Sequence, residues 1–202
     1  MSEIVLLETF DGSAPDPRLR WYCPPERWSL LNSCLVLEPD AKTDYWQKTH
    51  YGFQVDNGHF LYLEMERDFC LSTKVRFFPI CQYDQAGLMV RFSPDYWIKT
   101  SVEYEPHEPS RLGSVVTNHG YSDWATQNFP AGQNELEFRI KREGDDYILS
   151  YREPDGEKSW VQMRIAHLHN PAEGPIQCGV YACSPIGAGF KAAYDYLKVE
   201  QE

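Results

Sequence analysis

Short runs of apolar and polar positions alternate along the chain, and turn residues such as Asp-Asn-Gly and Gly-Asp-Asp separate them. No run keeps a helical period over three turns. Many short strands with turns between them predict an all-β sandwich or barrel with little helix. The predicted strands are approximately Leu30–Leu37, His59–Met65, Leu71–Phe78, Ala86–Phe92, Trp97–Glu105, Gly113–Asn118, Glu135–Lys141, Tyr147–Arg152, Val161–His167, Gln177–Cys183 and Ala192–Val199.

Alternation within these runs assigns one face of each strand to the core. Ile98, Val102 and Tyr104 share one face of their run, and Lys99, Ser101, Glu103 and Glu105 share the other. In the same way, Leu71, Val75 and Phe77 oppose Ser72, Lys74 and Arg76. One apolar and one charged face per strand is what two packed antiparallel sheets require.

The expected architecture is one domain over residues 1–202, a length that suits a single large sandwich. We expect about twelve strands, with Ile4–Phe10 near Ala192–Val199, because closing both sheets requires the two ends of the chain to meet. The proline-rich segment 11–28 is predicted to be a loop whose aromatic side chains are buried.

The stretch from Asp84 to Thr126 predicts a ligand-binding region at a strand end. It indicates two long strands, a turn, a third strand and then a loop that carries Ser122, Asp123 and Trp124. Loops at strand ends are common places for binding residues. The competing interpretation is a structural loop in which Trp124 closes the end of the sandwich.

Charge and composition narrow the partners. The formal net charge is −11, so a nucleic-acid partner is not expected, and no basic run suggests a membrane surface. No segment has the length of a transmembrane helix, and Glu3 and Glu8 flank the apolar run at the N-terminus, so no signal peptide is predicted. We therefore expect a cytoplasmic protein whose six cysteines, which show no CxxC spacing, are reduced.

Six motifs occur in order along the chain: DQAGLMVRF, WIKTSVEYE, LGSVVTNHGYSDWAT, REGDDYILSYREPDGEKSW, CGVYACSPIGAGF and YDYLKV. As an ordered set they resemble the regulation-of-enolase family, a domain of unknown function with the concanavalin A-like lectin/glucanase fold. The resemblance covers roughly Glu8 to Val199 and implies a jelly-roll sandwich with adjacent first and last strands. It implies no established reaction and no agreed catalytic residues.

The candidate ligand-binding residues lie on strand positions opposite to the core, or in the predicted loop. If their strands are neighbours, they form a patch that could hydrogen-bond a polyhydroxylated ligand while Trp124, Trp46 or Tyr121 stacks on it. The alternative is a solvated sheet face with cross-strand ion pairs. The residues are Lys74, Arg76, Arg91, Lys99, Glu103, Tyr121, Asp123 and Trp124.

No catalytic residues, metal ligands or cofactors are predicted. Glu64, Glu66 and Asp68 share a face, but their order differs from the Glu-x-Asp pattern of glucanases that share this fold. His167 and His169 share a face too, yet zinc sites need three or four ligands. The sequence has no phosphate-binding loop and no nucleophile elbow.

The sequence therefore favours a non-catalytic module that binds a carbohydrate or a similar polar small molecule on a concave sheet face. Two alternatives remain open: a regulatory protein-interaction domain that acts on a metabolic enzyme, and a glycoside hydrolase-like enzyme.

Overall fold

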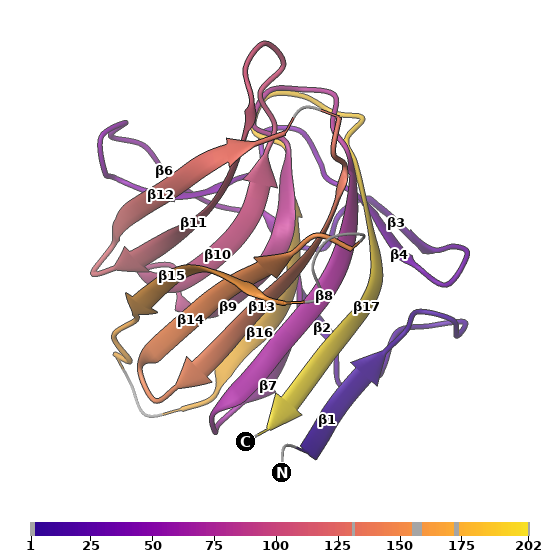
Figure 1. The fold of residues 1–202 in the computed structure, drawn as a ribbon, viewed down its shortest axis with the longest axis vertical. Helices are drawn as coiled ribbons and strands as arrows, with labels where there is room; N and C mark the ends of the chain where they lie inside the picture. Colours follow the sequence, from indigo (N-terminus) through magenta and orange to yellow (C-terminus); the bar gives the residue numbers. More distant parts are fainter. Residues whose placement is uncertain (1–2, 131, 155–158, 172–173, 202) are drawn as a thin grey trace.

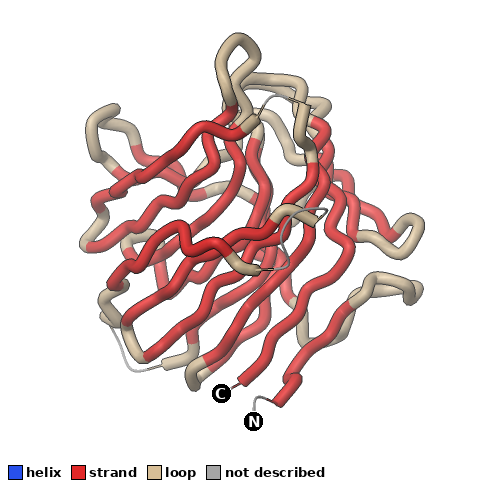
Figure 2. Tube along the Cα trace, viewed as in Figure 1, coloured by secondary structure: helices blue, strands red, loops and turns tan. Residues whose placement is uncertain are grey.

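The computed structural model of the chain is an all-β sandwich (Figures 1 and 2). It describes residues 3–130, 132–154, 159–171 and 174–201, and this part of the chain contains no helix. The strands are β1 Glu3–Glu8, β2 Arg20–Tyr22, β3 Arg27–Leu30, β4 Leu35–Glu38, β5 Tyr45–Gln47, β6 Gln54–Asp56, β7 His59–Met65, β8 Phe69–Phe78, β9 Gln85–Ser93, β10 Tyr96–Glu103, β11 Ser110–Asn118, β12 Tyr121–Phe129, β13 Glu135–Glu143, β14 Asp146–Arg152, β15 Val161–His167, β16 Ile176–Cys183 and β17 Lys191–Gln201.

Two antiparallel sheets form the concanavalin A-like jelly roll. The eight-stranded sheet has the order β15-β14-β13-β8-β17-β4-β3, and β1 also pairs with β17. The seven-stranded sheet has the order β12-β11-β10-β9-β16-β7-β2. Strand β1 runs beside the end of β17, so the two termini lie side by side, as expected (Figure 1).

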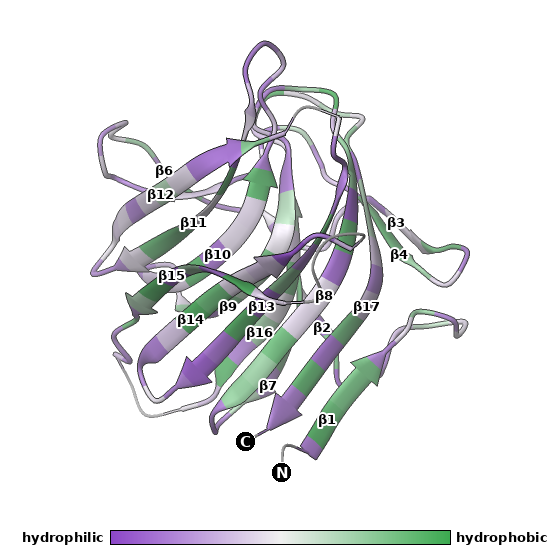
Figure 3. Cartoon of the chain, in the orientation of Figure 1, coloured by the Kyte–Doolittle hydropathy of each residue, from purple (hydrophilic) through white to green (hydrophobic). Residues whose placement is uncertain are grey.

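The core lies between the sheets and is built from the alternate positions that the sequence pattern assigns to it. Leu71, Val75, Ile98, Leu136 and Phe138 are all fully buried there. The same alternation appears as green and purple bands along β13 and β17 in Figure 3. Burying one face of each strand is therefore what fixes the register of both sheets.

The prediction that Ser122, Asp123 and Trp124 lie in a loop is wrong, because they are part of strand β12. These residues belong to an edge strand that pairs with β11 along its whole length. His119 and Gly120 form the two-residue turn before it, and both have positive φ (54° and 72°), as a type I′ hairpin turn requires. The strand was missed because an exposed edge strand lacks the alternation of apolar residues.

The N-terminal third differs from the prediction in a second way. Segment 11–28 contains the short strand β2 and the start of β3, and Trp28 is exposed rather than buried. The predicted run Leu30–Leu37 is two strands, because Asn32 and Ser33 turn the chain with positive φ. All six cysteine thiols are free. No helix able to cross a bilayer occurs in the described ranges.

A small hairpin, β5–β6, lies on the outer face of the seven-stranded sheet. Tyr45 and Trp46 of the hairpin pack on an aromatic floor that includes Phe60, Trp97 and Tyr181. The Tyr45 hydroxyl donates to the Gly58 carbonyl at 2.5 Å. A second, smaller core therefore lies on a sheet face that would otherwise meet solvent.

Two buried ion pairs hold the hairpin on this face. Lys99 Nζ lies 3.3 Å from Asp44 Oδ1 and donates to the Tyr45 carbonyl at 2.9 Å. Arg91 Nη2 donates to Asp56 Oδ2 at 2.8 Å, and its guanidinium lies 4.3 Å from the centre of the Tyr22 ring. Lys99 and Arg91 are only 3% and 5% exposed, so both charges depend on their partners.

Replacing Arg91 with alanine should destabilise the protein strongly. Arg91→Ala leaves Asp56 of the hairpin without its cation, so we expect the free energy of unfolding to fall by about 3–5 kcal/mol. Urea denaturation measures this change. Arg27→Ala is the matched control, because Arg27 is 64% exposed in its pair with Glu38 and should contribute less than about 1 kcal/mol. Equal losses in the two variants would contradict the buried-pair account.

Candidate functional site

A pocket of about 410 Å³ lies where the hairpin meets the outer face of the seven-stranded sheet. Its floor consists of Lys99, Val115 and Trp124, which stand side by side on β10, β11 and β12. We call it the aromatic pocket. Its full lining is Asp44, Trp46, Tyr51, Phe53, Tyr83, Lys99, Glu103, Glu105, Arg111, Val115 and Trp124.

Aromatic rings form most of the wall. Trp46 and Tyr51 meet edge to face with their centres 5.3 Å apart, and Tyr51 stacks on Phe53 at 6.0 Å. The Trp46 indole N–H donates to the Thr49 carbonyl at 3.0 Å, which fixes the ring. Tyr51, Phe53 and Trp124 remain 55%, 44% and 37% exposed, so their faces are available for stacking.

Polar groups converge on one side of these rings. Gln85 Nε2 donates to Glu103 Oε2 at 3.0 Å, and Lys99 lies four residues before Glu103 on the same face of β10. The pKa of Glu103 is raised from its ordinary 4.5 to about 7, mainly by burial; the Lys99 charge lowers it, and the negative charges of Asp44 and Glu105 contribute to the rise. A carboxyl that keeps its proton near neutral pH can both donate and accept a hydrogen bond.

A second hollow of about 550 Å³ adjoins the aromatic pocket at the beginning of β12. It shares Trp46, Tyr51 and Trp124 with the pocket and adds five more residues: Thr49, His50, Tyr121, Ser122 and Asp123. We call it the outer hollow. Trp46, Tyr51 and Trp124 thus form an aromatic ridge that separates the aromatic pocket from the outer hollow.

The structure brings together Lys99, Glu103 and Trp124, and it places Tyr121 and Asp123 in the outer hollow. Arg91 lies on the same sheet face but beneath the hairpin, where Asp56 occupies it. Asp123 forms an ion pair with Arg164 of β15 at 2.9 Å. Arg91 therefore has an anchoring role that strand parity could not distinguish from a ligand contact.

Lys74 and Arg76 do not join this group, because β8 belongs to the eight-stranded sheet. The condition that their strands neighbour those of Arg91 and Lys99 is not met. Lys74 pairs with Glu135 at 3.0 Å and with Asp195 at 3.3 Å, and Arg76 pairs with Asp195 at 2.6 Å. These side chains form the cross-strand ion-pair network that was the competing interpretation.

Several residues that line the aromatic pocket were not predicted from the sequence: Asp44, Tyr51, Phe53, Tyr83, Glu105 and Arg111. Three of them lie between residues 44 and 53, outside every predicted strand. The density of aromatic residues in DYWQKTHYGF, just before an Asp-Asn-Gly turn, was the available sign of a hairpin that needs a surface to cover. Nothing in the sequence indicated which sheet would receive it.

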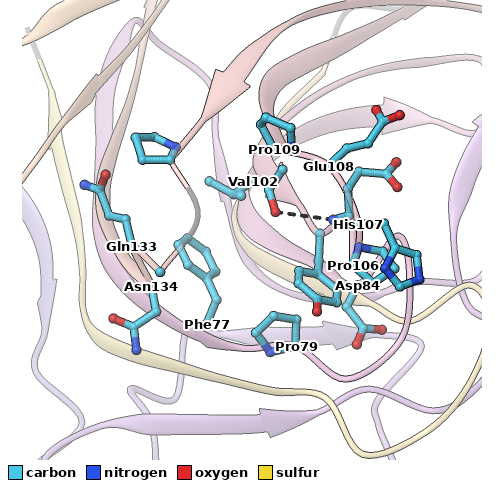
Figure 4. A pocket seen from close by; sticks show the side chains of 15 residues that line it. Phe77, Pro79, Asp84, Val102, Pro106, His107, Glu108, Pro109, Gln133 and Asn134 are labelled. Carbon is cyan, nitrogen blue, oxygen red and sulfur yellow. Dashed lines mark hydrogen bonds between the residues drawn. The ribbon is translucent and has the colours of Figure 1, made fainter.

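A larger pocket of about 630 Å³ opens at one end of the sandwich (Figure 4). Phe77, Pro79, Pro106 and Pro109 surround it, together with loop residues such as His107. The Glu105 N–H donates to Ser110 Oγ there at 3.3 Å. Its lining combines proline rings with loop backbone and has few flat aromatic faces, so the smaller aromatic pocket is the better candidate for ligand binding.

The acidic strand β7 and the histidine-bearing strand β15 belong to different sheets. Glu64 faces Arg20 at 4.0 Å on the exposed edge of the seven-stranded sheet. The centre of the His169 ring lies 4.8 Å from that of His119 and 4.7 Å from that of His167. His167 also pairs with Asp146. No group of three metal-ligating side chains suitable for an ion occurs in the part of the chain that the structure describes.

Fold and pocket together define a lectin/glucanase-type β-sandwich with an aromatic-lined depression on one sheet. Residues 21–202 match the family described as "Protein of unknown function (DUF1349)", and the chain belongs to this family. It is 34% identical over 160 residues to Regulation of enolase protein 1 of Saccharomyces cerevisiae, covering 79% of this chain and 78% of that protein. The resemblance to the regulation-of-enolase family is thereby confirmed.

Solved structures support the same fold. A functionally unknown protein from Saccharomyces cerevisiae superposes with a TM-score of 0.83 at 30% identity, over 92% of this chain and 97% of that one. A xylan beta-1,4-xylosidase from Bacillus halodurans C-125 gives a TM-score of 0.78 at 15% identity, over 97% of this chain and 39% of the enzyme. The similarity covers only part of the enzyme's length. At this sequence identity it shows a shared fold.

The buried carboxyl predicts a specific pH dependence of stability. Between pH 4.5 and 7, an unfolded Glu103 loses its proton while the native one retains it, so the free energy of unfolding falls as pH rises through this window. Glu103→Gln removes this titration. From pH 4.5 to pH 8 the variant should therefore gain on the order of 2–3 kcal/mol relative to the wild type.

Urea denaturation at the two pH values measures this difference. Glu64→Gln is the control, because the Glu64 side chain is 42% exposed and lies on the same sheet face. If the free energy of unfolding changes equally with pH in the wild type and in Glu103→Gln, Glu103 titrates as an ordinary surface carboxyl.

Proposed function

We propose that the chain is a non-catalytic binding module that takes a carbohydrate or a similar polar small molecule in the aromatic pocket. The observation that carries the proposal is the combination of exposed ring faces with convergent polar groups on a rigid sheet. Trp124 and Tyr51 supply the faces, and Glu103 and Lys99 supply the hydrogen bonds. Sugars present an apolar ring face and a polar rim, and this pocket matches both.

The burial of Lys99 and Glu103 supports a binding site at this position and argues against a solvated sheet face. Lys99 uses two of its three donors, on Asp44 and Tyr45, among the described residues. Glu103 accepts from Gln85 through one carboxyl oxygen and lines the pocket. The neighbours' printed names agree with a sugar ligand: one is a xylosidase, and another is the CBM2 module of Lactobacillus casei BL23 phage J-1 evolved Dit, at a TM-score of 0.65 and 8% identity.

Trp124 is the residue whose removal tests this proposal. Trp124→Ala deletes the stacking face at the floor, so binding of xylo- or cello-oligosaccharides should weaken by about 1–2 kcal/mol, or about 5- to 30-fold in Kd. Isothermal titration calorimetry measures the change. Trp28→Ala is the matched control, because Trp28 is similarly exposed (39% against 37%) but lies on the eight-stranded sheet.

The circular dichroism spectra of both variants must match that of the wild type. If Trp124→Ala unfolds, Trp124 is rejected as the stacking residue. It is also rejected if the variant stays folded and its Kd is unchanged. Wild-type protein that binds none of the sugars rejects the carbohydrate ligand.

A regulatory protein-interaction role is the second candidate, and the name of the yeast relative favours it. The exposed rings of Tyr51, Phe53 and Tyr83 would then meet a metabolic enzyme such as enolase. We place this interaction in the cytoplasm. Titrating purified enolase into wild type and Phe53→Ala separates the two roles, because a complex that needs Phe53 but is insensitive to sugar supports the regulatory one.

Hydrolysis is the third candidate, since a carboxyl with a pKa of about 7 is suited to general acid catalysis. We expect no turnover, because the nearby carboxylate of Asp44 is already paired with Lys99. Aryl glycosides and β-glucans incubated with the wild type should give rates equal to a buffer blank. A rate above the blank that disappears in Glu103→Gln would establish an enzyme instead.

A further inference from the structure

We propose that the site accommodates an extended, neutral oligosaccharide across two subsites, and not a single sugar unit. This inference rests on the proposed function and specifies its ligand. The aromatic pocket and the outer hollow share one wall, made of Trp46, Tyr51 and Trp124. An oligosaccharide that stacks on this wall in the aromatic pocket can therefore place its next unit in the outer hollow.

The two depressions are each large enough for a ligand unit of their own. The aromatic pocket has a volume of about 410 Å³ and the outer hollow a volume of about 550 Å³. Each volume lies in the range of a complete small-molecule site, so a single sugar unit would leave one of the two depressions unfilled.

The ridge between the subsites is fixed in position. The Trp46 side chain is 7% exposed and its indole is held by the Thr49 carbonyl, while Ser122 Oγ accepts the Gln47 N–H at 2.9 Å. Ser122 and Thr117 also bond to each other at 2.8 Å beneath the hairpin. Both subsites are therefore preformed, which reduces the ordering cost of binding a chain across them.

The outer subsite has its own ligand-facing groups. Tyr121 is 61% exposed, and the ammonium group of Lys48 lies 5.1 Å from the centre of its ring. The His50 and Tyr51 rings meet edge to face at 4.8 Å on the opposite side. Two ring systems thus border the outer subsite, as they border the inner one.

The charges around the subsites favour a neutral chain over an acidic one. In the aromatic pocket, Lys99 has Asp44 as its anionic partner, and Arg111 has Glu108 at 2.7 Å. Glu105 adds a further carboxylate, which accepts from Gln82 at 2.8 Å. A uronic acid unit in this pocket would meet these carboxylates where both lining cations are already paired, and the net charge of −11 would also repel it.

The test is a chain-length series. Calorimetry with xylose, xylobiose, xylotetraose and xylohexaose, and with the matching cello-oligosaccharides, measures Kd against the number of units. We expect affinity to rise about ten-fold, equal to about 1.4 kcal/mol, between the disaccharide and the tetrasaccharide, and then to level off. An affinity that does not depend on length overturns the two-subsite proposal while the binding function stands.

Two variants of the outer subsite identify where the gain arises. Tyr121→Ala should abolish the ten-fold gain and leave the affinity for the disaccharide unchanged. His50→Asn should reduce the gain, and asparagine keeps the left-handed backbone that His50 adopts at φ 61°. Trp124→Ala, in contrast, should weaken short and long ligands alike, because it borders both subsites.

Loss of disaccharide binding in Tyr121→Ala would show that the subsites are not separate and would overturn the proposal. The absence of binding at any length overturns both this inference and the proposed function. Galacturonic acid tetramers provide the charge comparison: they should bind at least about ten-fold more weakly than the neutral tetramers at pH 8, and tighter binding would reject the neutral ligand.

Discussion

Two buried ion pairs, Lys99–Asp44 and Arg91–Asp56, determine how one face of the sandwich is used. Each joins a cation on the seven-stranded sheet to an anion of the β5–β6 hairpin. A cation buried on an aromatic floor is costly without its partner, so the hairpin and the sheet stabilise each other's charges. The hairpin consequently has one favourable position, although its two short strands pair only with each other.

That position creates the pocket. The sheet provides a floor of Val115 and Trp124, and the hairpin contributes the opposite wall of Trp46 and Tyr51. Burial raises the pKa of the Glu103 carboxyl in this pocket to about 7, which a flat solvated sheet would not do. Packing of a local element thus sets both the shape of the site and the protonation of a group inside it.

The fold was predictable because alternation is a local property of each strand. Strand β7 and strand β15 begin and end at the predicted residues, and Phe138 and Val75 face the core as expected. The site was less predictable because parity gives the face of a strand but not the sheet to which it belongs. Lys74 and Lys99 have the same sequence signature, yet one lies in a surface ion-pair network and the other lies beneath the hairpin.

The turn of the β5–β6 hairpin is built from residues that tolerate unusual backbone angles: Lys48, His50 and Gly52 all have positive φ. This turn carries Tyr51 and Phe53 but contributes nothing to the core between the sheets. Substitutions, insertions or deletions here would reshape the wall of the aromatic pocket while the sandwich keeps its stability, much as loop variation does on other rigid scaffolds. Proteins that share these strands can therefore differ in the shape of the pocket through one short segment, and similarity across the strands is a poor guide to a shared pocket.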